Sequence, residues 1–238
     1  MQQPKTESKM GKETGASAIA AENLITLAEP GGMAAEDYRT LRTSLLYTVV
    51  DNPPKVVVVT SPGPKEGKST TCANLGVVLA QADKSTLIID CDFRRPAMHQ
   101  VFGLRNFKGV VNVLANELEL QETWHEPVPF LKVATVGPLP SRPAELLGSK
   151  RFSELLEKAR EQFDYVLLDA PPTAPVSDPA ILATQGDGVL LVLDAQKTRK
   201  ASLRKAKRTL DAVGASVLGT VMNNVKGGQK GLYSAYSY

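Results

Sequence analysis

The sequence of 238 residues has no long hydrophobic run and no apolar leader. No segment approaches the ~18 consecutive apolar residues that a membrane-spanning helix needs. The first fifteen residues, MQQPKTESKMGKETG, lack the apolar core of a secretory signal. Both absences favour a cytoplasmic protein that is held at the inner face of the cell membrane only through a partner.

Cysteine and net charge are also scarce. The two cysteines, Cys72 and Cys91, show no metal-binding spacing and are expected to be reduced core residues. Lys and Arg number 28, Asp and Glu number 25, and this net charge of +3 is too small to indicate nucleic-acid binding. With 42% hydrophobic residues, the chain is expected to form one large α/β domain with appendages.

The most informative segment runs from Val56 to Thr71, VVVVTSPGPKEGKSTT. Its four valines predict a buried strand of a parallel sheet, and the Gly-Lys-Ser sequence opens a helical pattern over about residues 68–82. A strand, a glycine-containing loop and a helix N-terminus form a phosphate site, because backbone N–H groups and the helix dipole face the anion. Gly67 permits close approach, Lys68 reaches the terminal phosphates, and Ser69 offers a hydroxyl to Mg²⁺.

The loop departs from the standard pattern at one place. That pattern has a glycine five residues before Gly67, where this chain has Pro62, and the glycine follows at Gly63. On the loop alone, a chance Gly-Lys-Ser in an ordinary strand–turn–helix is therefore an alternative. The residues predicted to contact a nucleotide are Gly63, Pro64, Lys65, Glu66, Gly67, Lys68, Ser69 and Thr70, with Asn223 at the end of the last predicted strand.

Two further apolar strands end in carboxylates. The segment TLIIDCDFRR places Asp90 and Asp92 at a strand end, and YVLLDAPP places Asp169 at another. A single aspartate at a strand end is often a turn former or a helix cap. Ligands of doubly wound sheets bind at the carboxyl ends of the strands. Three such carboxylates are therefore expected to converge on a metal ion and the γ-phosphate.

Apolar runs alternate with helical segments along the chain. This alternation predicts an α/β fold with a mostly parallel, doubly wound sheet of the P-loop NTPase type. Strands are expected near 55–60, 86–91, 131–136, 164–169, 188–194 and 216–223, and helices over 33–48, 68–82, 149–161 and 199–213. The predicted division is a flexible N-terminal arm over 1–32, a P-loop domain over 33–225 and a Gly-rich tail over 226–238.

Two predicted helices carry charged faces. In helix 33–48 these charges are Glu36, Arg39 and Arg42. A solvated face with intrahelical ion pairs would account for them. Helix 199–213 is rich in lysine and arginine, which indicates either a solvated face or a surface for an anionic partner.

The tail contains three of the six tyrosines in its last six positions: Tyr233, Tyr236 and Tyr238. A preceding glycine-rich segment, KGGQKG, gives flexibility. The tail could dock on its own domain or on a neighbour, or its phenols could be substrates.

Together these features resemble the bacterial tyrosine kinases, cytoplasmic P-loop kinases of capsule and exopolysaccharide synthesis. The resemblance runs from about Met33 to Tyr238. The family's glycine-poor phosphate loop is similar to SPGPKEGKST, although Lys65 stands where a glycine is usual. Its other motifs are similar to IIDCDFR at residues 88–94, VLLDAPP at 166–172, the Glu36–Arg39–Arg42 helix and the tyrosine cluster.

The resemblance implies an ATP- and Mg²⁺-dependent protein-tyrosine kinase. By resemblance, Ser69 and Asp92 lie beside the Mg²⁺ ion, and Asp169 holds the metal's water shell. Lys68 neutralises charge on the β- and γ-phosphates. By the same resemblance, Asp90 is expected to be the base that accepts the proton of the attacking phenol. These four charged residues, Lys68 and the three aspartates, form the expected catalytic set. Arg94 is expected either to steady phosphate or the tail, or to be a structural ion-pair partner.

The resemblance also implies partners. Glu36, Arg39 and Arg42 are expected to join subunits into an octameric ring, in which each tail is phosphorylated by a neighbour. Further expected partners are the cytoplasmic tail of a membrane activator, an opposing protein-tyrosine phosphatase and other tyrosine-containing proteins, but not nucleic acid.

Two rivals remain. A septum-positioning or partition ATPase would carry a signature lysine at the position of Gly63. A nucleotide-binding scaffold would regulate polysaccharide assembly without catalysis.

Overall fold

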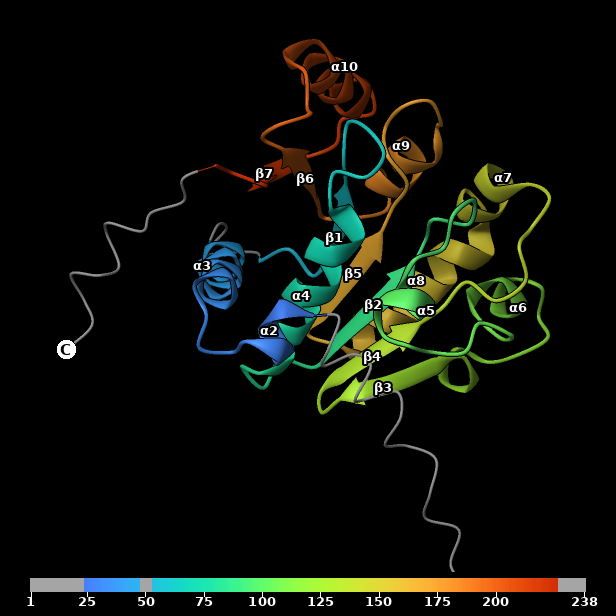
Figure 1. The fold of residues 1–238 in the computed structure, drawn as a ribbon. Coiled ribbons are helices and arrows are strands. Elements are labelled where there is room, and N and C mark those ends of the chain that lie inside the picture. Colours follow the sequence, from blue (N-terminus) through green and yellow to red (C-terminus); the bar gives the residue numbers. More distant parts are fainter. Residues whose placement is uncertain (1–23, 48–52, 227–238) are drawn as a thin grey trace, which may run out of the picture.

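The computed structural model describes residues 24–47 and 53–226. These residues form a seven-stranded sheet with helices on both sides (Figure 1). All neighbouring strands run parallel except β3 and β4, which confirms the predicted mostly parallel α/β fold. In spatial order the strands are β3 (Trp124–Val128), β4 (Leu131–Ala134), β2 (Thr86–Asp90), β5 (Tyr165–Asp169), β1 (Val56–Thr60), β6 (Gly188–Asp194) and β7 (Val217–Asn223).

Strand β3 was not predicted from the sequence. Its residues, WHEPV, include a proline and two polar side chains instead of an alternating apolar pattern. It pairs only with β4, antiparallel, and the register shifts between His125 and Val128. Proline is tolerated in a strand at the edge of a sheet, where its missing N–H breaks no ladder.

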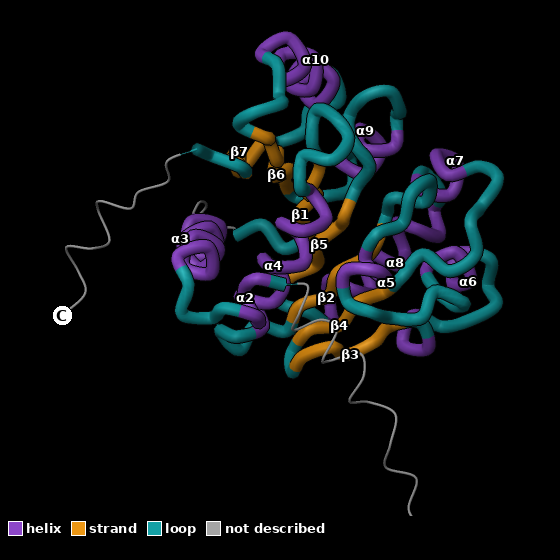
Figure 2. Tube along the Cα trace, viewed as in Figure 1, coloured by secondary structure: helices purple, strands orange, loops and turns teal. Residues whose placement is uncertain are grey.

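Helices cover both faces of the sheet, as Figure 2 also shows. Strands β1, β2 and β5 are buried along their whole length, which explains their continuous apolar sequences. Val57 and Val59 face one helical layer, whereas Val56 and Val58 face the other. The first layer contains α2 (Ile25–Ala28), α3 (Met33–Tyr47), α4 (Lys68–Ala80) and α5 (Met98–Val101). The second contains α6 (Val110–Leu114), the 3₁₀ turn η1 (Leu120–Glu122), α7 (Pro143–Leu147), α8 (Lys150–Gln162), α9 (Asp178–Ala183) and α10 (Lys200–Asp211). Among the described residues, no helix combines the length and apolar character needed to cross a bilayer.

Residues 24–32 correct the predicted N-terminal arm. Leu24 is fully buried, and both the backbone N–H and the hydroxyl of Thr26 donate to Oδ1 of Asn74, at 3.1 and 2.8 Å. The prediction of a flexible arm over 1–32 is therefore wrong for residues 24–32. One buried leucine and a four-residue helix leave no periodic signal in the sequence, which is why this segment was missed. Residues 1–23 lie outside the described residues.

The carboxyl ends of the parallel strands meet at one edge of the sheet. Strand β5 lies between β1 and β2, so that Asp90 and Asp169 are direct neighbours in register. The chain passes from β1 to β2 on one side of β1 and later reaches β6 on its other side. In parallel sheets whose strand order reverses in this way, ligands bind beyond the carboxyl ends of the strands, at the point of reversal.

Candidate active site

The loop between β1 and α4 requires glycine immediately before the helix. Gly67 has a φ of +93°, which L side chains rarely adopt. A Cβ at this position would also lie 2.3 Å from Nδ2 of Asn223. The loop therefore needs Gly67 both for its turn and for its close approach to the end of β7.

Two side chains hold this loop from behind. The carboxylate of Glu66 accepts hydrogen bonds from the N–H of Gly63 at 2.8 Å and from the hydroxyl of Thr198 at 2.5 Å. The amide nitrogen of Asn223 donates to the carbonyl of Glu66 at 3.0 Å and to the hydroxyl of Thr71 at 3.2 Å. Glu66 and Asn223 were predicted as nucleotide contacts, but here they brace the loop. Such bracing depends on tertiary contacts and gives no local sequence signal.

Lys68 joins the ends of two strands. Its ammonium group lies 3.2 Å from Oδ2 of Asp92, 3.2 Å from Oδ1 of Asp169 and 3.0 Å from the hydroxyl of Ser69. Burial would lower the pKa of Lys68, but the charges of Asp169 and Asp92 outweigh burial and raise it. The lysine is therefore a fixed positive charge. The structure thus brings together four of the predicted site residues.

The oxygen atoms around Lys68 are suitable ligands for Mg²⁺. Oδ2 of Asp169 is buried without a hydrogen-bond partner, and burial raises the pKa of this carboxyl. Two carboxylates and a hydroxyl are hard oxygen ligands, and Mg²⁺ commonly combines one or two carboxylates with substrate phosphates. Within the described residues there is no cluster of three or more His, Cys, Asp or Glu that could hold a metal. Asp92, Asp169 and Ser69 therefore suit a metal that is shared with a phosphate ligand.

Asp90 is close to this group but does not face the open site. Its side chain is fully buried, and Oδ2 accepts hydrogen bonds from the N–H groups of Ala97 and Met98, at 2.9 and 3.0 Å. Oδ1 accepts from the N–H of Asp92 at 3.1 Å. Burial and the neighbouring charge of Asp169 raise the pKa of Asp90 to about 7. In this conformation Asp90 orders the chain between β2 and α5, and a role as base requires it to give up one of these contacts.

Arg94 forms a bidentate ion pair with Asp178. Its Nε and Nη2 lie 2.8 and 3.1 Å from the two carboxylate oxygens, and the Asp178 side chain is fully buried. Of the two roles left open by the sequence, the structural ion pair is the one observed. Asp178 was not singled out from the sequence, where the Ser-Asp-Pro at residues 177–179 reads only as a helix start.

A pocket of about 630 Å³ opens at these strand ends. Pro171, Pro172 and Pro175 line it together with residues of the phosphate loop. Its polar lining is mainly cationic, with Asp92 as its one carboxylate among the described residues. The predicted site residues that line it are Pro64, Lys65, Gly67, Lys68, Ser69, Thr70 and Asp92, whereas Gly63, Glu66, Asp90, Asp169 and Asn223 do not.

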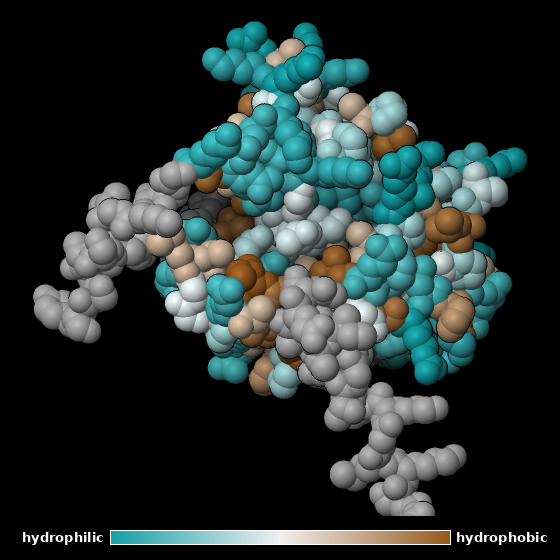
Figure 3. All heavy atoms as spheres, in the orientation of Figure 1, coloured by the Kyte–Doolittle hydropathy of each residue, from teal (hydrophilic) through white to brown (hydrophobic). Residues whose placement is uncertain are grey.

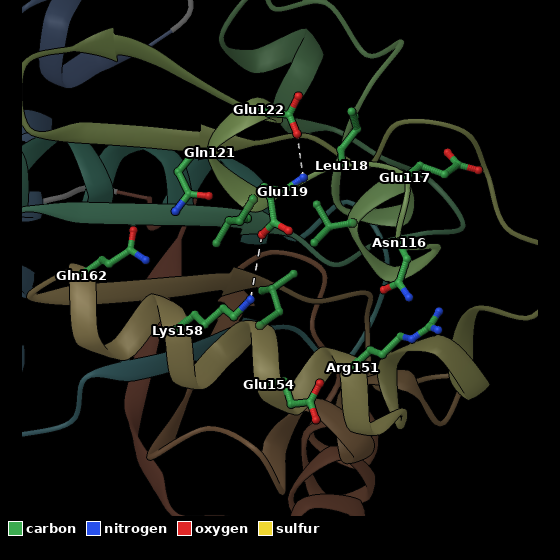
Figure 4. A pocket seen from close by; sticks show the side chains of 13 residues that line it. Asn116, Glu117, Leu118, Glu119, Gln121, Glu122, Arg151, Glu154, Lys158 and Gln162 are labelled. Atoms are coloured by element: carbon green, nitrogen blue, oxygen red, sulfur yellow. Dashed lines mark hydrogen bonds and ion pairs between the residues drawn. The ribbon is translucent and has the colours of Figure 1, made fainter.

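A second pocket of about 280 Å³ lies between residues 116–122 and α8 (Figure 4). It shares no lining residue with the first pocket and contains none of the sequence motifs. Its charged side chains have mixed sign, and Lys158 forms an ion pair with Glu119 at 3.9 Å. The chemistry expected from the sequence therefore belongs to the larger pocket.

Comparison with known proteins identifies the family. A family model described as an AAA domain matches residues 54–218. The tyrosine-protein kinase YwqD of Bacillus subtilis (strain 168) is 40% identical over 215 residues, which cover 90% of this chain and 91% of that protein. The chain belongs to the bacterial tyrosine kinase family. It is a protein-tyrosine kinase.

Solved structures agree with this assignment. The chimerical protein CapA2B2 superposes on the kinase with a TM-score of 0.83 at 33% identity, covering 86% of this chain and 90% of that chain. The kinase domain of Escherichia coli tyrosine kinase ETK gives a TM-score of 0.81 at 31% identity, covering 84% and 79%. The cell division ATPase MinD of Pyrococcus furiosus shares the fold at 22% identity, with a TM-score of 0.61 and 71% of each chain covered. The fold alone therefore does not separate the kinase from the septum-positioning rival, whereas the sequence identity does.

The predicted interface residues of the kinase make contacts within the subunit. Arg39 forms an ion pair with Glu36 at 2.8 Å and donates to the carbonyl of Pro30 at 2.5 Å. Arg42 donates to the carbonyl of Val78, near the end of α4, at 3.0 Å. The predicted phosphorylation sites, Tyr233, Tyr236 and Tyr238, lie outside the described residues.

Proposed function

We propose that this kinase transfers the γ-phosphoryl group of ATP to the tyrosines of its own C-terminal cluster. The observation that carries the proposal is the position of Lys68 between Asp92 and Asp169, in the lining of a pocket at the carboxyl edge of the sheet whose charged side chains are mainly cationic. Phosphoryl transfer asks a protein chiefly to position the reactants and to neutralise charge. A fixed ammonium group beside two carboxylates and a hydroxyl supplies both requirements.

Each residue of the site has a role in this reaction. The loop and the N-terminus of α4 hold the phosphates through backbone N–H groups, and Lys68 neutralises their terminal charge. Ser69, Asp92 and Asp169 would hold Mg²⁺, which supplies charge neutralisation on the phosphate oxygens when bound. The phenol oxygen forms a bond to the γ-phosphorus while the bond to ADP breaks. The phenol proton passes to a base, for which Asp90 is the nearby carboxyl.

Lys65 places a cation where a glycine is usual in the family that the sequence resembles. Its φ of +59° is a left-handed conformation, which costs a non-glycine residue roughly 1 kcal/mol. Its exposed side chain lines the pocket. We expect Lys65→Gly to raise the free energy of unfolding by up to about 1 kcal/mol and to weaken nucleotide binding, because it removes both the strain and the charge.

Denaturant unfolding and nucleotide titration measure these two effects of Lys65→Gly. Lys65→Ala is the matched control, since it removes the charge and keeps the left-handed backbone. Equal nucleotide affinity in wild type and in both variants would show that this ammonium group plays no part in binding.

The tail could reach an active site by either of two routes. The family resemblance predicts transfer between subunits. Strand β7, however, ends at the carboxyl edge, where Asn223 donates to the carbonyl of Glu66. Transfer between subunits is still proposed on the family resemblance, but this contact favours transfer within one chain as a specific alternative.

Mass spectrometry of the purified chain after incubation with Mg-ATP tests the proposal directly. We expect phosphate on Tyr233, Tyr236 and Tyr238. Mixing active protein that lacks its tail with intact Lys68→Met protein then tests the route. Phosphate on the inactive chain supports transfer between subunits, whereas labelling at a rate independent of concentration, confined to intact active chains, supports transfer within one chain.

We also propose that the kinase forms a ring through Glu36, Arg39 and Arg42. Arginine–carboxylate pairs give directional contacts that suit a repeated interface. Replacing all three residues with alanine is expected to give monomers by light scattering. Arg42→Ala alone is the control for folding, because Arg42 also contacts the carbonyl of Val78. An unchanged particle mass in the triple variant would count against the ring.

The wider role proposed here is regulation of capsule or exopolysaccharide synthesis and export. A membrane activator with a cytoplasmic tail would hold the kinase at the inner face of the membrane, and a protein-tyrosine phosphatase would oppose it. Other tyrosine-containing proteins are further proposed substrates. The scaffold alternative is tested by comparing loss of phosphotyrosine with loss of complex assembly in Lys68→Met. Loss of phosphotyrosine together with loss of regulated assembly supports the enzyme, whereas loss of phosphotyrosine with assembly unchanged supports the scaffold.

A further inference from the structure

Helix α10 presents a continuous cationic face to solvent. At 100° per residue, its five basic side chains fall within an arc of about 160°. All five are exposed, and the single acidic residue of the helix, Asp211, pairs with Lys207 at 2.6 Å. Figure 3 shows a hydrophilic surface over this helix at the top of the molecule. The basic residues are Lys200, Arg204, Lys205, Lys207 and Arg208.

This face differs from an ordinary solvated helix. Lys200, Arg204 and Arg208 follow one another at spacings of four residues, where like charges destabilise a helix. In helix α8, by contrast, basic side chains form ion pairs with acidic side chains three or four residues away. Lys150 pairs with Glu154 at 3.1 Å, and Arg160 pairs with Glu157 at 3.4 Å. Apart from the Lys207–Asp211 pair, α10 has no such ion pair within the described residues, and Lys200, Arg204 and Arg208 have no acidic partner there. This unrelieved repulsion indicates an anionic partner.

The tail of the chain begins beside this helix. Asn224 donates from Nδ2 to Asp194 at 2.8 Å, and the side-chain amide of Gln196 donates to the carbonyl of Asn224 at 2.8 Å. These bonds fix the start of the tail against the segment that leads into α10. Tyr233 is seven positions beyond Lys226, and a chain of this length spans up to about 23 Å. Because α10 is about 18 Å long, Tyr233 can reach every turn of the cationic face.

The charge of the tail depends on whether its tyrosines are phosphorylated. Residues 227–238 contain one lysine and no acidic side chain, so the unmodified tail has no attraction to α10. Each phosphotyrosine adds about −1.5 to −2 charges, or roughly −5 to −6 for three. We propose that the exposed cationic face of α10 binds the phosphorylated form of the chain's own tail. The proposal rests on the proposed function, since that function supplies the phosphotyrosines.

The side chains on α10 favour discrete phosphates over a lipid surface. Arg204 and Arg208 offer planar forks that match phosphate oxygens two at a time. The apolar side of α10, with Ala206 and Leu210, is buried in the core. It is therefore not available for insertion between lipids, which interfacial helices require. The short tether also gives the phosphotyrosines a high effective concentration at α10.

A synthetic peptide of residues 227–238 with three phosphotyrosines tests the surface. It is titrated against the full chain, first dephosphorylated, with excess ADP to fill the phosphate loop, and followed by fluorescence anisotropy. We expect the phosphopeptide to bind at least about tenfold more tightly than the unmodified peptide, and more weakly at high salt. Arg204→Gln/Arg208→Gln is expected to lower its affinity about tenfold, whereas Lys150→Gln/Lys158→Gln on α8 leaves it unchanged.

A second measurement uses the phosphorylated full chain. We expect a tyrosine phosphatase to remove the tail phosphates several-fold faster from the α10 variant than from the α8 control. Equal affinities and equal rates in the two variants would overturn the proposal. So would α10-dependent binding to phosphatidylserine vesicles without α10-dependent binding of the phosphopeptide, which would assign the surface to lipid. If the kinase puts no phosphate on its tail, the proposed function fails, and the peptide titration still reports on α10.

Discussion

Lys68→Met is expected to lower phosphoryl transfer by about 10³-fold, since a single positive group on the transferred phosphoryl contributes effects of this order. The ammonium group is placed for this role by Asp92 and Asp169, each at 3.2 Å, and methionine keeps the length of the side chain without its charge. The rate of phosphotyrosine formation with saturating Mg-ATP measures the effect. Lys150→Met, at a lysine whose side chain is 91% exposed, is the matched control and should retain the wild-type rate.

The same variant should also lose stability. Asp92 and Asp169 are buried, and removing their shared partner leaves uncompensated charge that costs about 3 kcal/mol. Mg²⁺ should restore part of this loss, because it would bind the same oxygens. Thermal unfolding with and without Mg²⁺ therefore reports on the metal site independently of catalysis. A Lys68→Met protein that phosphorylates tyrosine at the wild-type rate would contradict the assignment of the site.

The parts of this site that could be predicted from the sequence are those fixed by strand ends. Asp92 and Asp169 follow apolar runs that can only be buried strands, and parallel strands bring their carboxyl ends to one edge. Lys68 then joins them because its loop follows a third such strand. The central sheet and the helices 68–82, 149–161 and 199–213 were predictable for the same reason, since their patterns are long and regular.

Contacts between distant segments were not predictable. The sequence gives no indication that Glu66 turns inward to Thr198, or that Asn223 donates to the carbonyl of Glu66. These partners are more than 100 residues away along the chain. The edge strand β3 and helix α2 were missed because elements this short, without a regular apolar pattern, depend on neighbours for their stability.

Asp90→Asn is expected to lower the turnover number by about 10² to 10⁴-fold, the range typical of losing a general base. The amide oxygen can still accept hydrogen bonds from the N–H groups of Ala97 and Met98, so the start of α5 should persist. The amide nitrogen, however, faces the N–H of Asp92, and this mismatch costs about 1–3 kcal/mol. Removing the negative charge beside Asp169 offsets part of that cost. The variant should therefore fold and bind nucleotide as the wild type does.

The control for this experiment is Asp187→Asn. Asp187 also accepts two backbone N–H groups, those of Lys55 and Val56 at 2.8 and 2.7 Å, but at the start of β1. Its loss should lower stability and leave the turnover number unchanged. If Asp90→Asn behaves in the same way, Asp90 only positions the loop, and the phenol loses its proton to another group. If its turnover number falls while nucleotide affinity is kept, the buried Asp90 carboxylate must become accessible during the reaction, with movement of the chain at Ala97 and Met98.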